Sequence, residues 1–93
     1  MRLRFYVDRR TGLPHVHGHG VTEAEVEEVL NAPDEDRPGS DGSRIAIGQT
    51  EAGRYLRAIY VPDPEPERVF VITAYTLEGK PLKAYQRRRR KKK

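Results

Sequence analysis

The sequence contains no cysteine, so disulfide bonds, thiolate metal ligands and a cysteine nucleophile are excluded. It also lacks an apolar run long enough for a signal peptide or a membrane-spanning helix. Only 35% of its 93 residues are hydrophobic, but these are concentrated in a few segments. A chain of this length and pattern predicts one domain with a single modest core, and we expect a soluble cytoplasmic protein.

The net charge of +4 is unevenly distributed along the chain. The last seven residues, RRRRKKK, are all basic, whereas residues 1–86 hold 11 Lys and Arg against 14 Asp and Glu. Eight of those acids lie within residues 22–42, beside a single base, Arg37. We therefore expect a compact domain over 1–86 with an acidic lobe, and a disordered basic tail over 87–93 that adds nonspecific affinity for nucleic acid.

Alternating apolar residues predict most of the secondary structure. Strands are expected at residues 3–8, 44–50, 54–61 and 68–76. The last of these is the richest in β-branched and aromatic residues, so it is placed at the centre of the sheet. Proline and glycine predict loops at 9–20 and 33–43, and a short helix begins near residue 80. The order β-α-β-β-β predicts an α+β fold, with one main helix on a mostly antiparallel sheet of about four strands.

The main helix carries the strongest local signal in the chain. Thr22 and Glu25 have the spacing of a capping box, and Pro33 ends the helix. The apolar residues Val26, Val29 and Leu30 form one stripe. In the sheet, alternation assigns to the helix side Ile45, Ile47, Leu56, Ala58, Phe70, Ile72 and Ala74. It assigns to the other side Arg44, Tyr55, Arg57, Thr73 and Tyr75, which suggests a surface for an anionic ligand.

The segment HVHGHG places His15, His17 and His19 at alternate positions, and three interpretations stay open. A zinc site would need converging imidazoles, but no cysteine is present and the helical H-E-x-x-H pattern is absent. His19 could instead pack on the strands beside the helix start. Acid-base or phosphate chemistry requires the loop to lie against the Arg/Tyr face, because histidine titrates near neutral pH.

Three stretches of the sequence resemble the BrnT family of bacterial type II toxins. They are HGHGVTEAEVEEVL, SRIAIGQTEAGRYLRAIYV and VFVITAYT, and the likeness covers about residues 3–76. The resemblance implies a RelE-like fold, a metal-independent ribonuclease activity without a cofactor, and an antitoxin protein as partner. The protein would then be a monomer or an antitoxin-bound complex.

The same resemblance assigns roles to individual residues. His19 matches the family histidine before the helix, Arg44 the arginine that opens the second strand, and Thr73 the strand serine. Tyr75 stands where the family has an arginine. If the family arginine stabilises phosphate charge, this chain either lacks that group or replaces it with Lys80, Lys83 or Arg57.

Ribonuclease chemistry can also be argued from the residues themselves. RNA supplies its own nucleophile, the 2′-hydroxyl, so the protein needs cations for the phosphate and an acid-base pair. Candidate cations are Arg44, Arg57 and Lys83, and candidate acids and bases are His17, His19 and Tyr75. Tyrosine also stacks on unpaired bases. Further candidates for RNA binding are Tyr55, Lys80, Arg87, Arg88, Arg89 and Arg90.

Two other functions remain open from the sequence. One is a non-catalytic RNA- or ribosome-binding domain, which the basic tail and Tyr75 favour. The other is a metal-binding or protein-interaction module centred on the histidines.

Overall fold

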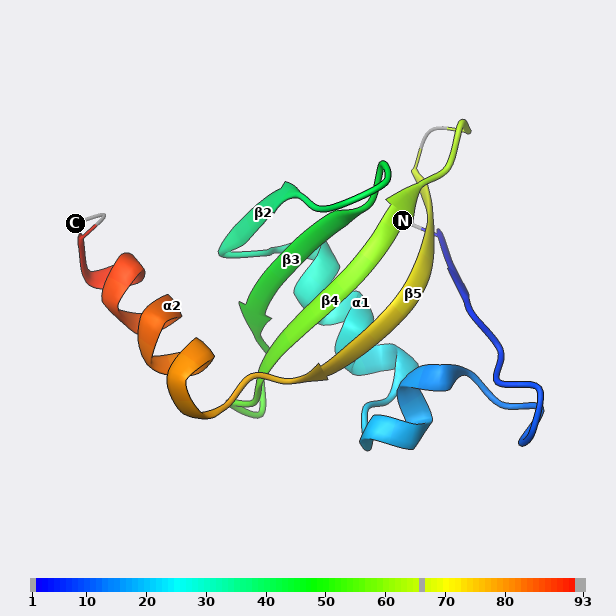
Figure 1. The fold of residues 1–93 in the computed structure, drawn as a ribbon, viewed down its shortest axis with the longest axis horizontal. Helices are drawn as coiled ribbons and strands as arrows, with labels where there is room; N and C mark the ends of the chain where they lie inside the picture. The colour runs from blue at the N-terminus through cyan, green and yellow to red at the C-terminus, as the bar shows by residue number, and fades with distance from the viewer. Residues whose placement is uncertain (1, 66, 92–93) are drawn as a thin grey trace.

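The structure is a computed structural model that describes residues 2–65 and 67–91. Its sheet has five strands in the order β1-β5-β4-β3-β2, and only β1 and β5 pair in parallel (Figure 1). The strands are β1 (Arg2–Phe5), β2 (Glu35–Pro38), β3 (Arg44–Gln49), β4 (Tyr55–Pro62) and β5 (Arg68–Thr76). The predicted α+β fold with a mostly antiparallel sheet is confirmed, with five strands instead of about four.

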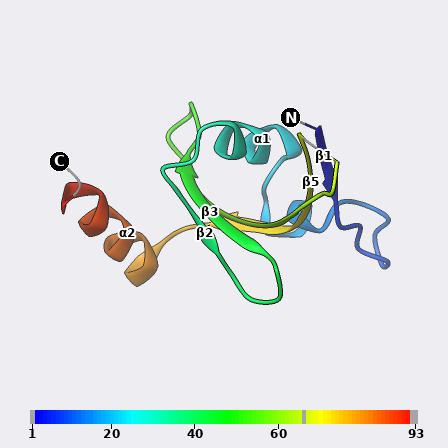
Figure 2. The same ribbon diagram turned by 90° about the horizontal axis from the view of Figure 1, so that it is seen from above.

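In the described part of the chain, three helices accompany the sheet: the 3-10 helix η1 (His15–His19), α1 (Glu23–Asn31) and α2 (Gly79–Lys91). Helix α1 begins as predicted, because the Thr22 hydroxyl accepts a bond from the Glu25 backbone N–H and the Glu25 carboxylate accepts one from the Thr22 N–H. Figure 2 shows α1 lying over one face of the sheet and α2 lying beside it, past the edge formed by β2 and β3. None of the helices in residues 2–65 and 67–91 is long and apolar enough to cross a membrane.

The core lies between α1 and the sheet. The predicted helix stripe is buried, with Val26 and Val29 at 0% exposure, and packs against the small residues Ala46, Ala58 and Ala74. Small residues on these strands let α1 approach the sheet closely. A Cβ placed on Gly48 would lie 3.2 Å from Cγ1 of Val29, so this position has no room for a side chain without movement.

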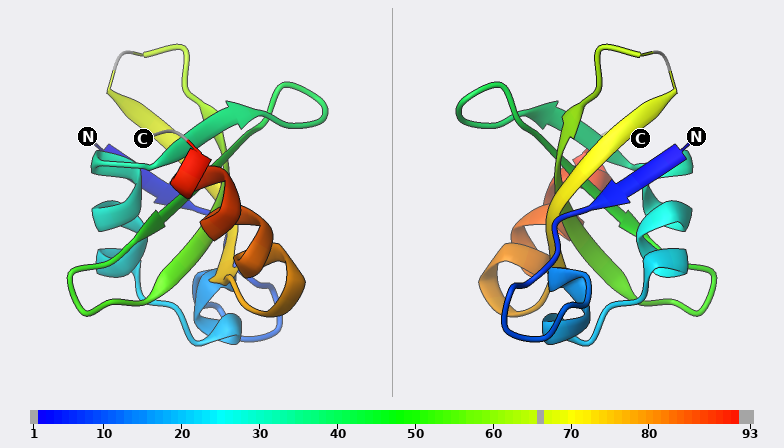
Figure 3. Two further views of the ribbon diagram at one scale, coloured as in Figure 1. Left: turned by 90° about the vertical axis from the view of Figure 1, so that its left-hand side faces the viewer. Right: turned by 90° about the vertical axis from the view of Figure 1, so that its right-hand side faces the viewer.

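Three predictions about the strands were wrong. β1 ends at Phe5, and Val7 is 48% exposed in an isolated bridge to Pro14. The predicted loop at 33–43 contains β2, a polar edge strand that ends at Pro38, where a missing N–H is tolerated. The middle strand is β4, whereas β5 lies between β4 and β1 (Figure 3, right).

The assignment of residues to the two sheet faces needs correction. Leu56, Ala58 and Ala74 face α1 as predicted, but on β3 the small residue Ala46 faces the helix, so Ile45 and Ile47 face away. Phe70 also faces away, because its register partner Arg4 lies over its ring, on the side opposite to Leu3 and Phe5. Ile72 has no partner on β4, since the register skips it at a bulge.

The C-terminal region also differs from the prediction. Residues 87–91, expected to be a disordered tail, form the last turns of α2, and residues 92 and 93 lie outside the described part of the chain. Tyr85 anchors α2, because it is 0% exposed and packs with Ile47 and Leu77. The Arg88 guanidinium forms a bidentate pair with the Glu35 carboxylate of β2, in which Nε and Nη2 donate at 2.8 and 2.9 Å.

Candidate functional site

The sheet face opposite α1 is called the open face. α2 packs on one end of it, where Tyr85 contacts Ile47 and Tyr55, and in Figure 2 α2 does not lie over the centre of the sheet. The register aligns Ile47, Arg57 and Tyr75 across β3, β4 and β5, and aligns Ile59 with Thr73 in the next row. Tyr55 lies two residues before Arg57 and therefore on the same face. Four of the five residues predicted for this face, namely Tyr55, Arg57, Thr73 and Tyr75, are brought together there.

Two polar atoms on the open face lack hydrogen-bond partners. Among the residues that the structure describes, three buried side-chain atoms have no hydrogen-bond partner: Arg57 Nε and Thr73 Oγ1 near the centre of this face, and Arg68 Nε at the start of β5. Leaving a buried polar group unsatisfied costs about 1–3 kcal/mol, so native proteins rarely retain such groups without a reason. Both atoms are shielded from solvent in this conformation, so an acceptor oxygen of a ligand such as phosphate reaches them only after the side chains that cover them move.

A row of aromatic and imidazole rings leads to this point from the edge of the sheet. Tyr6, His15, His19 and Tyr75 are linked by edge-to-face contacts with ring centroids 6.0, 5.1 and 5.9 Å apart. The ring of His19 therefore packs on β5, as one of the sequence interpretations proposed. It also lies next to Tyr75, whose register partner is Arg57. An imidazole and a phenol are thus in contact on β5, at a position whose register partner on β4 is an arginine.

His17 is directed elsewhere. Its Nε2 lies 2.5 Å from Oε1 of Glu23, in the first turn of α1, and both side chains are partly exposed. The three histidines do not converge, and residues 2–65 and 67–91 hold no group of three or more His, Asp or Glu side chains placed to bind a metal ion.

Arg44 was predicted on the open face, and this was wrong. It is the register partner of Tyr60 and lies on the α1 side, because β3 alternates in the opposite phase. Its Nε donates to Asp36 Oδ1 at 2.9 Å, and the Tyr60 hydroxyl donates to Asp36 Oδ2 at 2.6 Å. The bond to Asp36 raises the pKa of Arg44, while burial and then the same carboxylate raise the pKa of Tyr60. Arg44 therefore supports the fold and cannot share a ligand with Arg57.

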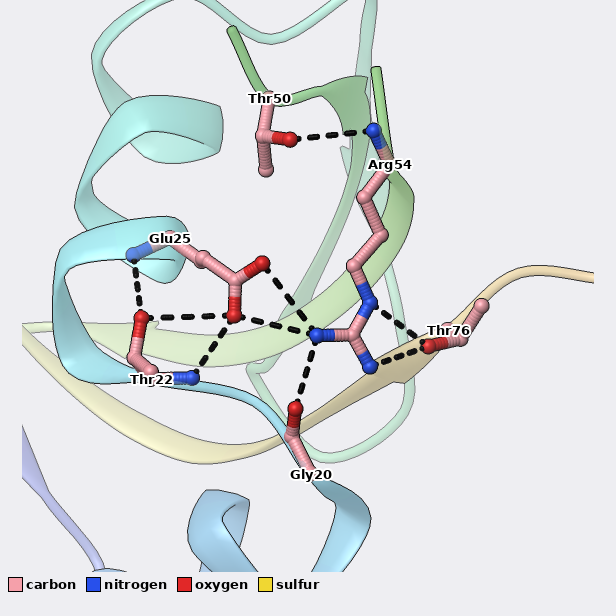
Figure 4. Close-up of polar contacts among 6 residues, drawn as sticks. All are labelled: Gly20, Thr22, Glu25, Thr50, Arg54 and Thr76. Carbon is pink, nitrogen blue, oxygen red and sulfur yellow. Dashed lines mark hydrogen bonds and ion pairs between the residues drawn. The ribbon is translucent and has the colours of Figure 1, made fainter. Parts of the chain in front are cut away.

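Sequence reasoning missed Arg54, which forms the densest polar cluster in the described residues (Figure 4). Its Nη1 donates to the Gly20 carbonyl at 2.7 Å and to both oxygens of Glu25, and its Nε and Nη2 donate to Thr76 Oγ1. The N–H of Thr22, followed by Arg54, lowers the pKa of Glu25. This cluster fixes the segment after His19 to the ends of β4 and β5. The only signal in the sequence was an arginine at the start of a strand.

The basic residues of α2 fall into two groups. Arg88 binds Glu35, and Arg89 lies 3.3 Å from the Asp34 carboxylate, so both hold α2 to the acidic segment that precedes and forms β2. The bond to Glu35 raises the pKa of Arg88. The other candidates are exposed on the helix surface, where nucleic acid could reach them: Lys80, Lys83, Arg87 and Arg90.

These features define an α+β domain in which one helix covers a single sheet face and the other face presents an arginine, a tyrosine and a histidine. The chain belongs to the DUF4258 family, a domain of unknown function, whose family model matches residues 16–76. The matched segment runs from η1 to the end of β5, so it includes the open face but neither β1 nor α2. No curated protein and no solved structure matches the chain. A relationship to the BrnT and RelE toxins therefore stays a prediction.

Proposed function

We propose that this protein is a BrnT-like, metal-independent endoribonuclease that binds RNA on the open face. The observation that carries the proposal is the pair of unsatisfied buried atoms, Arg57 Nε and Thr73 Oγ1, beside the contact between His19 and Tyr75. An RNA phosphodiester provides acceptor oxygens for the first pair. The second pair provides groups that can exchange protons.

In the proposed reaction, the 2′-hydroxyl of the RNA attacks the adjacent phosphorus. His19 accepts the proton of this hydroxyl, and Tyr75 donates a proton to the departing 5′-oxygen as the P–O5′ bond breaks. Arg57 stabilises the negative charge that develops on the phosphate oxygens, and Thr73 fixes the orientation of the phosphate. The products are a 2′,3′-cyclic phosphate and a 5′-hydroxyl end.

A second candidate is RNA binding without cleavage. Two observations favour it: Tyr75 stands where the resemblance implies an arginine, and Arg44 is engaged by Asp36 on the other side of the sheet. Only one guanidinium, that of Arg57, then remains in the row with Tyr75. Tyrosines on a sheet surface with nearby cations are sufficient for stacking on unpaired bases.

Incubation of the purified full chain with single-stranded RNA in the presence of EDTA distinguishes the two. We expect fragments with cyclic phosphate ends, and no fragments from RNA carrying 2′-O-methyl groups. Arg57→Ala should lower the rate by roughly 100-fold or more, as for other charge-stabilising groups, and His19→Ala by a similar factor. Arg10→Ala, in the exposed loop after β1, is the matched control and should cut normally.

Each outcome of this experiment has a clear meaning. RNA that is bound in a salt-sensitive manner but recovered intact supports the second candidate and rejects catalysis. Cleavage that is equally fast in Arg57→Ala would reject the open face as the active site. RNA that is neither bound nor cut by the folded protein rejects both.

The toxin hypothesis makes a separate prediction in cells. We infer that an active ribonuclease of this kind acts on cytoplasmic RNA and requires an antitoxin protein that covers the open face. Expression of the intact chain should then arrest bacterial growth, and Arg57→Ala should relieve the arrest. Normal growth with the folded, intact protein present would reject the toxin role.

A further inference from the structure

A pocket lies where α2 meets the start of β4, at the end of the open face. Its volume is about 440 Å³, within the usual range for small-molecule sites. The lining residues are Tyr55, Tyr85, Gln86, Arg89 and Arg90. The combination of two aromatic rings, one amide and two guanidinium groups is suited to a planar ligand that carries a negative charge.

The two rings of the pocket have different roles. Tyr85 is fully buried, and its hydroxyl donates to Asp34, so its position is fixed. Tyr55 contacts it edge-to-face, with ring centroids 5.8 Å apart and an interplanar angle of 64°. Tyr55 is only half-buried, so part of its ring remains accessible from the pocket. A flat base can stack on a ring that is held in this way.

The polar groups come from one side of α2. Gln86 and Arg90 are four residues apart and therefore lie one above the other on the helix surface. Both arginines are exposed, but Arg89 is paired with Asp34 at 3.3 Å, whereas Arg90 has no carboxylate within 4.0 Å among the residues that the structure describes. The pocket thus offers an amide that can donate and accept hydrogen bonds, and beside it a cation that a phosphate can reach.

We propose that this pocket binds one unpaired adenosine nucleotide of the RNA. The base stacks on Tyr55, the Gln86 amide reads its edge, and Arg90 contacts its phosphate. Adenine is the expected base because a glutamine amide can donate to N7 and accept from N6 of adenine at the same time. The inference deepens the proposed function and rests on it. Tyr55 lies two residues from Arg57 on the same face, so the pocket holds the nucleotide next to the phosphodiester at Arg57.

Most of this pocket lies outside the segment that the family model matches. Four of its five lining residues come from α2, which lies outside the matched segment 16–76. We therefore expect residues 16–76 to bind the phosphodiester, and α2 to determine which base is preferred beside it.

The first test titrates the full chain with AMP and, separately, with UMP, and follows the backbone and Gln86 amide signals by NMR. We expect AMP to bind on the order of tenfold more tightly than UMP, with the largest changes at Tyr55 and Gln86. Gln86→Ala should bring the two affinities to within about twofold, and Tyr55→Leu should weaken both. Lys91→Ala removes a cation from the same helix outside this pocket and is the control.

Equal binding of AMP and UMP by the unaltered protein, or shifts confined to residues away from the pocket, would overturn the inference. The second test maps cleavage sites in RNA. We expect cuts at one fixed position relative to adenine. Gln86→Ala should lose this preference and cut adenine-containing RNA more slowly, whereas Lys91→Ala should keep both the preference and the rate. Cleavage with no base preference rejects the pocket but leaves the ribonuclease intact. Selective AMP binding without any RNA cleavage rejects the ribonuclease but leaves the pocket.

Discussion

Arg54→Ala should lower the thermal stability of the protein strongly, because a single guanidinium joins three separate segments. It bonds the Gly20 carbonyl before α1, the Glu25 carboxylate within α1, and the Thr76 hydroxyl at the end of β5. Removing it leaves the Thr76 hydroxyl without its donor in a partly buried position, and leaves the exposed Gly20 carbonyl to water.

The size of the effect follows from these contacts. Each lost hydrogen bond, to Gly20 and to Thr76, contributes about 1 kcal/mol net. The ion pair with Glu25 adds less than about 1 kcal/mol, because the Arg54 and Glu25 side chains are 30% and 21% exposed and are screened by water. The expected total is roughly 2–3 kcal/mol. In a domain of this size each kcal/mol shifts Tm by about 4–8 °C, so Tm should fall on the order of 10–20 °C.

Thermal unfolding followed by circular dichroism measures this loss. Arg54→Lys should lose about half as much as the alanine variant, because one ammonium group cannot reach all three acceptors. Arg37→Ala is the control, since Arg37 is exposed on β2 and its nearest carboxylate is 4.0 Å away. It should change the stability by less than about 0.5 kcal/mol. If Arg54→Ala unfolds at the same temperature as Arg37→Ala, the cluster does not hold these segments together.

Three further predictions concern pH and packing. The pKa of Glu25 lies below its ordinary 4.5, chiefly because a helix-cap N–H donates to it. The stability that Glu25 contributes is therefore present above pH 4.5 and is lost as the pH falls through the pKa of the folded state. In urea unfolding, Glu25→Gln should destabilise the protein at neutral pH and have little effect in acid. Burial, followed by a carboxylate acceptor, raises the pKa of Tyr85 to about 12. The stability that the Tyr85 hydroxyl contributes is complete below pH 10 and is lost as the pH rises towards 12. In a titration followed by phenolate absorbance, Tyr85→Phe should remove the ionisation step of one tyrosine near pH 12. Gly48→Ala should lower the free energy of unfolding in urea by about 1–3 kcal/mol, because the added Cβ would contact Val29. Gly18→Ala is the control, since no atom lies within 4 Å of the Cβ added there.

The sequence predicted best those features that depend on neighbouring residues. The start of α1 was confirmed because Thr22 and Glu25 form the capping box without help from the rest of the chain. The extent of β5 was also confirmed, since its β-branched residues carry a strong local preference. β2 was missed because an edge strand can be short, charged and closed by Pro38, and hydrophobic alternation gives no signal for it.

The candidate site was predicted in part, because strand alternation is also a local pattern. Arg57 lies on β4, whose phase was correct, and Thr73 and Tyr75 lie on the part of β5 after the bulge, where the phase was also correct. His19 contacts Tyr75, as one interpretation required. Arg44 was misplaced because RIAIGQ alternates large and small residues, and its sequence does not reveal which set faces a helix. Close helix packing favours the small set, which turns Arg44 toward α1.

The helical part of the basic tail depends on contacts between distant residues. Arg88 reaches Glu35 across more than fifty positions in sequence. No local pattern records such a pairing, so the run of arginines was predicted to be a solvated segment, with folding back onto the acidic helix as the alternative.

The parallel pairing of β1 with β5 has a consequence for how this protein folds during synthesis. Arg2–Phe5 can align only with residues 68–71, so the ribosome must pass Val71 before the first strand finds its neighbour. Until then Leu3 and Phe5 cannot pack against the core, and their apolar side chains stay exposed in the nascent chain, where they favour aggregation. Joining segments so far apart costs loop-closure entropy, and we expect this step to be among the last to form.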